Sequence, residues 1–333
     1  MKKTLAIVIL TWNDYNNTIK CIKSVANQLG KDKKIFLVDN NSKIAIFEKT
    51  IKWIKKNYKS KIYNKTFFKI EKISNRTFKD KSIFILRNQR NLGCGLGHNS
   101  GYKLAIKNKF EFIARIDNDM IVPKSFFKKI IKNFSDKKVH AISPKILYTK
   151  NPKMIWWMGA RIGHNLKFDK HMRDYPHGLI DNKKYKGIVK TDAIAGCASV
   201  MRSSRLKEVG LSDKDFFYGP EDIELSKRLF KEKGSLIVNR NIKIFHSVTQ
   251  SFVNLEKRKI YYEYKYRLLL IKKIGSSSDK LIGYSFSLIK SLLYLLLFFQ
   301  YKHRNKIIPV FKAWNDFLLN KFGDFDRKNK LPF

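Results

Sequence analysis

Two carboxylates stand two residues apart at the end of an apolar run. Asp117 and Asp119 flank Asn118, after the apolar run 112–116 and before a second apolar pair. At the end of a buried strand their oxygens could hold a hard divalent cation such as Mg²⁺ or Mn²⁺, and through it a phosphate group. The competing interpretation is an ordinary turn, because Asp and Asn are favoured there. The triplet therefore predicts a metal site only in company with other motifs.

A second acidic pair, Glu221 and Asp222, follows Gly219-Pro220 and begins a helical pattern that ends at Gly234. Pro and acidic residues are common at any helix start, so the pair alone indicates a helix N-terminus. A carboxylate in this position could also accept a proton as a general base. Two other features of the sequence favour that role: the small-residue stretch 192–201, and His246 at the end of a predicted strand over 242–245.

The elements that must position these residues follow from hydrophobic periodicity. Up to about residue 250, short β-branched runs alternate with helical patterns, which predicts an α/β domain with a largely parallel sheet flanked by helices. We expect a helix over 19–29 and strands over 5–10, 35–38, 83–86 and 112–116. Polar clusters follow the strands at 39–42, 91–95 and 117–119. The carboxyl ends of such strands form the ligand crevice of open α/β sheets.

A glycine-rich segment runs from Asn91 to Gly101. It resembles a phosphate-binding loop, but its spacing from Gly93 is G-x-G-x-G and is followed by His98, which does not fit G-x-G-x-x-G. The segment therefore argues against a dinucleotide-dependent dehydrogenase.

Composition narrows the class of protein. The 333 residues include 70 Lys and Arg against 27 Asp and Glu, a net charge of +43, while 44% of residues are hydrophobic, enough for a folded core. The basic residues are mostly lysine, whereas nucleic-acid surfaces rely on arginine for bidentate contacts. Three cysteines stand far apart, which indicates neither a disulfide framework nor a zinc site and favours a reducing cytosol.

The last part of the chain has a different character. Residues 281–299 are nearly all apolar, a length near the roughly 20 residues of a membrane span. Lys290 interrupts the run, and basic residues flank both of its ends. We favour a helix lying in the membrane interface over a spanning helix. Residues 256–333 are therefore predicted to form a helical, membrane-associated region.

Six segments in order resemble the family-2 glycosyltransferases with a GT-A fold: 8–25, 37–42, 91–105, 116–120, 195–225 and 245–247. The likeness covers roughly residues 4–270 and is greatest to the rhamnosyltransferase-like branch that builds bacterial surface polysaccharides. Residues 1–255 are then the catalytic domain. Because the interval from Ser42 to Asn91 is longer than this family leads us to expect, residues 58–82 are interpreted as a surface insertion.

The resemblance implies inverting transfer of a sugar, with rhamnose as one candidate. The implied donor is a nucleotide sugar (UDP- or dTDP-linked), and the implied acceptor is lipid-linked or a glycan at the cytoplasmic face of the membrane. Asp39 matches the acid that reads the nucleotide base, and Asp222 matches the catalytic base, with Glu221 supporting it. The metal ligands would be Asp117, Asp119 and His246, for Mg²⁺ or Mn²⁺. The implied nucleotide-sugar-binding residues are Thr11, Asn13, Asp39, Asn41, Asn91, Gly95, Asn99 and Asp117.

Two other classes stay open at this point. A nucleotidyltransferase on a similar scaffold would release pyrophosphate instead of a nucleoside diphosphate. A basic polyanion-binding module would account for the charge and would bind nucleic acid in a strongly salt-dependent way. Such a module has no use for ordered acidic motifs, so we expect no specific nucleic-acid partner.

Overall fold

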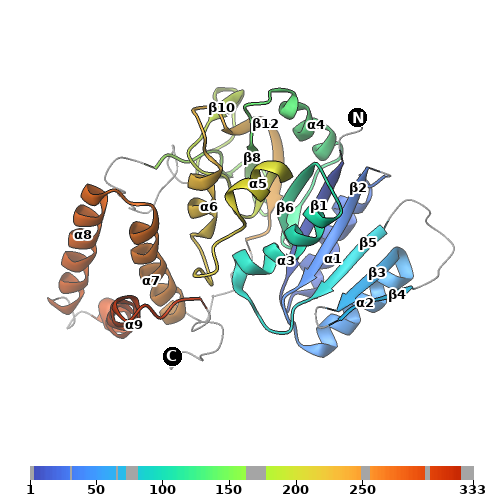
Figure 1. The fold of residues 1–333 in the computed structure, drawn as a ribbon. Coiled ribbons are helices and arrows are strands. Elements are labelled where there is room, and N and C mark those ends of the chain that lie inside the picture. The colour runs from blue at the N-terminus through green and yellow to red at the C-terminus, as the bar shows by residue number, and fades with distance from the viewer. Residues whose placement is uncertain are drawn as a thin grey trace.

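The computed structural model describes residues 4–30, 32–64, 67–72, 82–162, 178–248, 256–296 and 301–323. It consists of an α/β domain with a three-helix bundle at one side (Figure 1). The strands are β1 Leu5–Thr11, β2 Lys33–Asp39, β3 Lys59–Asn64, β4 Phe67–Lys72, β5 Ser82–Arg87, β6 Phe112–Asp117, β7 Met120–Ile121, β8 Ala141–Tyr148, β9 Ile155–Trp157, β10 Ile188–Lys190, β11 Ala198–Arg202 and β12 Leu236–His246. The helices are α1 Tyr15–Ala26, α2 Ile44–Asn57, α3 Gly93–Lys107, α4 Phe126–Lys132, α5 Ser203–Val209, α6 Glu221–Leu229, α7 Glu256–Ile274, α8 Ser277–Leu296 and α9 Tyr301–Leu318, with 3-10 turns η1 Asn133–Ser135 and η2 Lys183–Tyr185.

The four strands expected from the sequence are confirmed as β1, β2, β5 and β6. They are parallel neighbours, with β1 between β2 and β6, and β5 beyond β2. Apolar residues of β1, β2 and β6 are buried on both faces, and β5 buries Ile83 and Ile85 on one face, which is why each strand appears in the sequence as a short, mainly apolar run. The helix expected over 19–29 is confirmed as α1, which begins earlier, at Tyr15.

The sheet as a whole is mixed, so the prediction of a largely parallel sheet is wrong outside the neighbouring strands β6, β1, β2, β5 and β3. Its order is β10-β12-β8-β11-β6-β1-β2-β5-β3-β4. Strand β11 lies antiparallel to both β6 and β8, β10 lies antiparallel to β12, and β3 antiparallel to β4. A strand buried on both faces shows its burial in the sequence, whereas its direction depends on where the preceding loop enters the sheet.

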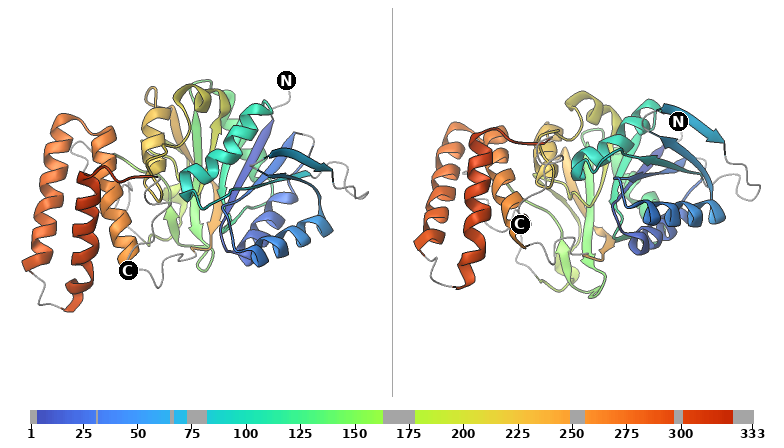
Figure 2. Two further views of the ribbon diagram at one scale, coloured as in Figure 1. Left: turned by 60° about the horizontal axis from the view of Figure 1, so that its bottom comes forward. Right: turned by 90° about the horizontal axis from the view of Figure 1, so that it is seen from below.

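Helices cover both faces of the sheet (Figure 2). Alternate residues of β1 divide between two cores, with Leu5, Ile7 and Ile9 in one and Ala6 and Val8 in the other. The first core also takes side chains from α1, α2 and α4, and the second from α3, α5 and α6. Packing between the two layers of helices fixes where each strand ends, and therefore the positions of the residues that follow the strands.

Part of the predicted insertion extends the sheet. The backbone of β3 pairs in parallel with β5, and β4 forms the outer edge. Residues 65–66 and 73–81 of the insertion lie outside the described residues.

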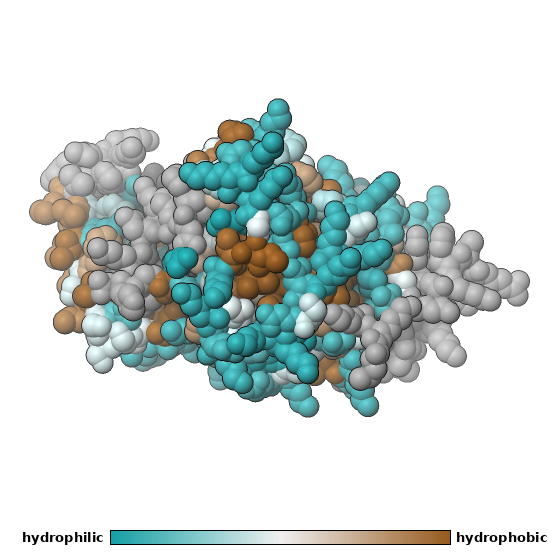
Figure 3. All heavy atoms as spheres, turned by 90° about the horizontal axis from the view of Figure 1, so that it is seen from above, coloured by the Kyte–Doolittle hydropathy of each residue, from teal (hydrophilic) through white to brown (hydrophobic). Residues whose placement is uncertain are grey.

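A groove of about 760 Å³ lies between α4 and the β10–β12 edge, with Lys129, Lys132 and Lys190 among its lining residues. Seen from above, the side on which α4 and β10 lie in Figure 1, apolar side chains form a patch surrounded by hydrophilic ones (Figure 3). The groove includes Val139, just before β8, whereas the predicted site follows the carboxyl ends of the strands. It is therefore separate from the acidic residues described below.

The C-terminal region is helical as predicted. Helices α7, α8 and α9 lie side by side, and α7 packs against α6 of the α/β domain (Figures 1 and 2). Residues 297–299 of the apolar run lie outside the described part of the chain. Within that part, none of the helices is long and apolar enough to cross a membrane.

Candidate active site

Strand register brings the predicted acidic residues to one edge of the sheet. Thr11, the last residue of β1, pairs with Asp39 at the end of β2, and Leu10 pairs with Asp117 at the end of β6. Residues Asp39 and Asp117 therefore flank the end of the central strand. Three segments far apart in the sequence contribute to this edge.

Asp119 and His246 form a pair beside that edge. Strands β7 and β12 align Met120 with His246, and the imidazole Nε2 lies 3.1 Å from Asp119 Oδ2. The ring packs edge-on against Trp156, with centroids 4.6 Å apart. A nitrogen and a carboxylate oxygen at this separation could bind one divalent cation.

The Asp117 carboxyl lies in a less polar environment than a surface acid. Burial raises its pKa to about 7, against the lowering effect of the Arg115 guanidinium. The negative charge of Asp119 raises it further. Near neutral pH this carboxyl therefore binds a proton readily, and a cation nearby would favour the ionised form.

Two hydrogen bonds, made by the backbone of the consecutive residues Gly196 and Cys197, connect Asp222 to Asp117 at the same edge of the sheet. Gly196 donates its N–H to Asp222 Oδ2 at 3.0 Å, and the Cys197 carbonyl accepts the N–H of Asp117 at 2.9 Å. Burial, and then the neighbouring charge of Glu221, raise the pKa of Asp222 to about 6. A carboxylate with this pKa is ionised at neutral pH and can still accept a proton.

Glu221, the other acid of the pair, forms a buried ion pair with Arg115. Its Oε1 accepts a hydrogen bond of 2.7 Å from Arg115, and both side chains are buried. Removing the carboxylate would leave the guanidinium buried without its countercharge. The structure thus supports a structural role for Glu221 in holding Arg115.

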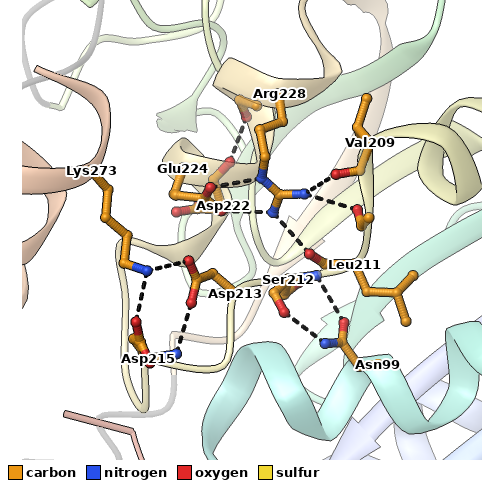
Figure 4. Close-up of polar contacts among 12 residues, drawn as sticks. Asn99, Val209, Leu211, Ser212, Asp213, Asp215, Asp222, Glu224, Arg228 and Lys273 are labelled. Carbon is orange, nitrogen blue, oxygen red and sulfur yellow. Dashed lines mark hydrogen bonds and ion pairs between the residues drawn. The ribbon is translucent and has the colours of Figure 1, made fainter.

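The loop before α6 is attached to three other parts of the protein (Figure 4). Arg228 makes a two-bond contact with Glu224 and donates to the carbonyls of residues 209–211. Lys273 of α7 contacts both Asp213 and Asp215, at 2.6 and 2.7 Å. The position of Asp222 therefore depends on contacts with α6 itself, α3 and the C-terminal bundle.

Asn99 supplies the contact with α3. Its side chain donates to the Ser212 carbonyl and accepts the Ser212 N–H, at 2.8 and 3.0 Å (Figure 4). Gly95, one turn earlier, packs so closely that a Cβ there would lie 2.9 Å from Glu221 and 3.0 Å from Ser212. These two residues, which the resemblance assigned to the nucleotide, hold the loop against α3.

Other residues assigned to the nucleotide shape the loops at the strand ends. Asn91 Oδ1 accepts hydrogen bonds from Asn40 Nδ2 and from Gly93 N–H, at 2.8 and 2.9 Å. The Thr11 and Thr18 hydroxyls lie 2.6 Å apart. Asn91 and Thr11 thus have polar partners within the protein.

The loops after β1 and β2 are joined by Asn13, which accepts the backbone N–H of Lys43 at 2.7 Å. Asn13 and Asn41 have φ angles of 53° and 64°, in the left-handed region that Asn tolerates better than most residues. Asp39 is buried beside them, 3.6 Å from Arg87, and burial raises its pKa despite hydrogen bonds from Ser42. Asp39 and Asp117 thus lie on either side of the end of β1, and Asp39 is partly neutralised by Arg87.

Three residues that matter to this geometry were not singled out from the sequence. Arg115 and Arg87 balance the charges of Glu221 and Asp39. Asn40 joins two loops through bonds to Asn88 and Asn91. Arg115 had a detectable signal, because it is a charged residue inside an otherwise apolar strand.

Solved structures share this architecture at low sequence identity. PcManGT, a mannosyltransferase from Pyrobaculum calidifontis crystallised with GDP-Man and Mn²⁺, has a TM-score of 0.53 and 10% identity over 95% of this chain and 87% of its own. TarS 1-349 from S. aureus has a TM-score of 0.52 and 11% identity, over 95% and 92%. GalNAc-T7, crystallised with UDP, GalNAc and Mn²⁺, has a TM-score of 0.52 and 16% identity over 85% of this chain but only 54% of its own. No curated protein matches the sequence significantly.

Together the mixed sheet and these neighbours define an α/β fold of the GT-A type. The sequence matches Glycosyl transferase family 2 over residues 6–207, more than half of the chain. The chain belongs to this family, as the motifs had indicated, and it is a glycosyltransferase.

Proposed function

We propose that this glycosyltransferase moves a sugar, with inversion, from a nucleoside-diphosphate donor to a lipid-linked or glycan acceptor at the cytoplasmic face of a membrane. The observation that carries the proposal is the meeting of Asp39, Asp117 and the Asp119–His246 pair at one sheet edge. Asp222 is tied to the same edge through Gly196 and Cys197. Acids that bind a donor and an acid that accepts a proton are thereby brought together.

Asp117, Asp119 and His246 carry the oxygen and nitrogen ligands that a divalent cation takes. Asp119 and His246 offer an oxygen and a nitrogen 3.1 Å apart, and Asp117 offers a buried carboxylate oxygen. Two of the structural neighbours were crystallised with Mn²⁺. When bound, the ion supplies positive charge to the diphosphate as the bond to the sugar breaks. Asp117, Asp119 and His246 are the residues that would hold it, whether it is Mg²⁺ or Mn²⁺.

Asp222 is the proposed base. The acceptor hydroxyl loses its proton as it attacks the sugar from the face opposite the leaving group, and the Asp222 carboxylate receives that proton. The Gly196 N–H occupies one side of Oδ2 and fixes the carboxyl plane. General-base catalysis of this kind contributes about 10²- to 10⁴-fold to rate.

The product identifies the reaction class. We expect free nucleoside diphosphate from a donor panel of UDP-, dTDP- and GDP-sugars, in which dTDP-rhamnose tests the rhamnosyltransferase resemblance. The GDP arm is included because PcManGT was crystallised with GDP-Man. Pyrophosphate would favour the nucleotidyltransferase alternative. If every donor were left unhydrolysed and untransferred with both Mg²⁺ and Mn²⁺, the proposal would be rejected.

Membrane association is proposed because α8 buries small residues and exposes large apolar ones, the reverse of a helix in a water-soluble protein. Its small residues Gly283, Ser287 and Ser291 are buried, and Trp314 of α9 donates its indole N–H to Ser291. Its large apolar residues are exposed instead: Leu281, Ile282, Phe286, Leu288, Ile289, Leu292, Leu293, Leu295 and Leu296. In Figure 3 apolar side chains gather at the outer side of the bundle.

Small residues inside and large apolar residues outside are typical of helices whose outer face contacts lipid. Because α8 was not found long and apolar enough to cross a bilayer, we propose that it lies in the interface. The net charge of +43 favours an anionic leaflet, at about 1 kcal/mol for each lysine near the surface. This location would deliver a lipid-linked acceptor.

A further inference from the structure

His98 of α3 has a defined tautomer. Its side chain is fully buried, and its Nδ1 lies 3.0 Å from the backbone carbonyl of Cys94. A carbonyl oxygen only accepts hydrogen bonds, so Nδ1 carries the hydrogen. In the neutral ring Nε2 then carries a lone pair.

That lone-pair nitrogen lies close to a metal-site carboxylate. His98 Nε2 is 3.4 Å from Asp117 Oδ1. Both atoms are buried, and neither has a hydrogen-bond partner among the residues that the structure describes. The Asp117 carboxylate and the Nε2 lone pair repel each other at this distance unless a proton or a metal cation lies between them. Neighbouring ligands of one octahedral Mg²⁺ lie about 3 Å apart, given bonds of about 2.0–2.1 Å.

We propose that His98 Nε2 is a nitrogen ligand of the divalent cation, paired with Asp117 as His246 is paired with Asp119. The inference rests on the proposed function, since it concerns the same cation-dependent site. It is supported by the bond on the other side of the ring. Metal-binding histidines nearly always donate their second ring N–H to a carbonyl or carboxylate, which fixes the ring, and the Cys94 carbonyl provides that contact here.

Cys94 is excluded from the ligand set by its own contact. Its sulfur completes a group of three possible ligands with His98 and Asp117, all within 4.8 Å. However, the Arg115 guanidinium donates to Cys94 Sγ at 3.0 Å. The positive charge of Arg115 is in turn balanced by Glu221, at 2.7 Å. Of these three residues, only His98 and Asp117 are therefore assigned as ligands, beside Asp119 and His246.

Two substitutions separate a ligand from a structural histidine. The amide of Asn can replace the Nδ1 donor of a histidine, and the amide of Gln can replace its Nε2 end. His98→Asn should therefore keep the bond to Cys94 and lose at least about 10-fold in Mn²⁺ affinity, whereas His98→Gln should bind Mn²⁺ more tightly than His98→Asn. If His98 only holds the Cys94 carbonyl, His98→Asn should instead bind Mn²⁺ more tightly than His98→Gln. That result would overturn the inference.

The affinity is measured with Mn²⁺ by electron paramagnetic resonance, with UDP, dTDP and GDP each present in separate samples. The matched control is His140→Asn, which changes a histidine whose Nδ1 likewise contacts a carbonyl, that of Leu229, at 3.3 Å. It should leave Mn²⁺ affinity unchanged. Melting temperatures of all variants show whether each is folded.

A second measurement does not depend on the folding of the His98 variants. Spin-echo spectra of bound Mn²⁺ detect imidazole nitrogen directly, and ¹⁵N-labelled histidine assigns the coupling. In His246→Asn a histidine coupling should persist, because His98 still binds the ion. Loss of all histidine coupling in that variant would overturn the inference and leave the proposed function intact. Failure of the wild-type protein to bind Mn²⁺ with any of the nucleotides would instead contradict the cation in the proposed function, and the inference with it.

Discussion

The backbone N–H of Gly196 lies 3.0 Å from Oδ2 of Asp222 and donates a hydrogen bond to it. A Cβ at position 196 would lie 2.6 Å from the same oxygen, closer than van der Waals contact allows. Glycine therefore does two things here: it orients the proposed base, and it leaves space for the carboxyl. The small-residue stretch noted in the sequence has a specific physical reason at this position.

Gly196→Ala should reduce turnover by displacing Asp222, while the dissociation constant of the donor changes little. The two effects differ because the donor is proposed to bind at Asp39, Asp117 and Asp119. Steady-state kinetics and donor titration measure them separately. Gly30→Ala is the control, because a Cβ there meets only the Asp32 side chain, at 3.2 Å. Equal turnover in the two variants would contradict the assignment.

The pH dependence of turnover should show the ionisation of Asp222. Its pKa is raised to about 6, so the carboxylate needed to accept a proton predominates above that pH. Turnover should rise through about pH 6 and then level off. Asp222→Asn should lower turnover by about 10²- to 10⁴-fold. It should change the melting temperature only slightly, because the amide oxygen can replace one of the two acceptors that now bind the N–H groups of Gly196 and Ile223, and a buried charge is removed. A variant with near-normal turnover would rule out Asp222 as the base.

Glu221→Gln should affect stability first. It leaves the buried Arg115 guanidinium without its countercharge, which costs about 3 kcal/mol of the free energy of unfolding. Chemical denaturation measures this loss. Glu208→Gln, which changes an exposed partner of Arg205, should leave the unfolding free energy nearly unchanged. If both variants unfold like the wild type, the ion pair has no structural role.

Asp119→Asn should abolish the rise in melting temperature that Mn²⁺ and a nucleoside diphosphate produce together. A ligand that binds only the folded state stabilises it in proportion to its affinity, so loss of a ligand residue lowers that rise. His246→Asn should weaken the effect. Asp136→Asn, at an exposed acid, should behave as the wild type. Undiminished stabilisation of Asp119→Asn would contradict the metal site.

Leu292→Glu should weaken binding to vesicles. This residue is exposed on α8, so the charge enters the proposed lipid-facing surface without entering the core. Flotation of the full chain with anionic and with neutral vesicles measures the effect. Lys207→Glu, on α5, is the control for net charge. Equal recovery of both variants with anionic vesicles would reject α8 as the contact surface.

Much of the catalytic domain follows from local patterns in the chain. Short, mainly apolar runs are enough to locate β1, β2, β5 and β6, because buried strands need apolar residues at most positions. The acids that follow these runs could be predicted to lie together, since parallel strands end at one edge. Asp39, Asp117 and Asp222 were identified in this way and from the family motifs.

Direction and pairing were decided by the tertiary structure. The antiparallel course of β11 depends on how the preceding loop crosses the sheet, and its first four residues are as buried as those of a parallel strand. The partners of buried polar groups are equally nonlocal: Glu221 meets Arg115, and Asn99 meets Ser212, across more than one hundred residues of chain. The sequence determined which residues carry charge at the strand ends. Only the fold determined which of those charges are neutralised internally and which face the site, because that depends on distances that no local pattern encodes.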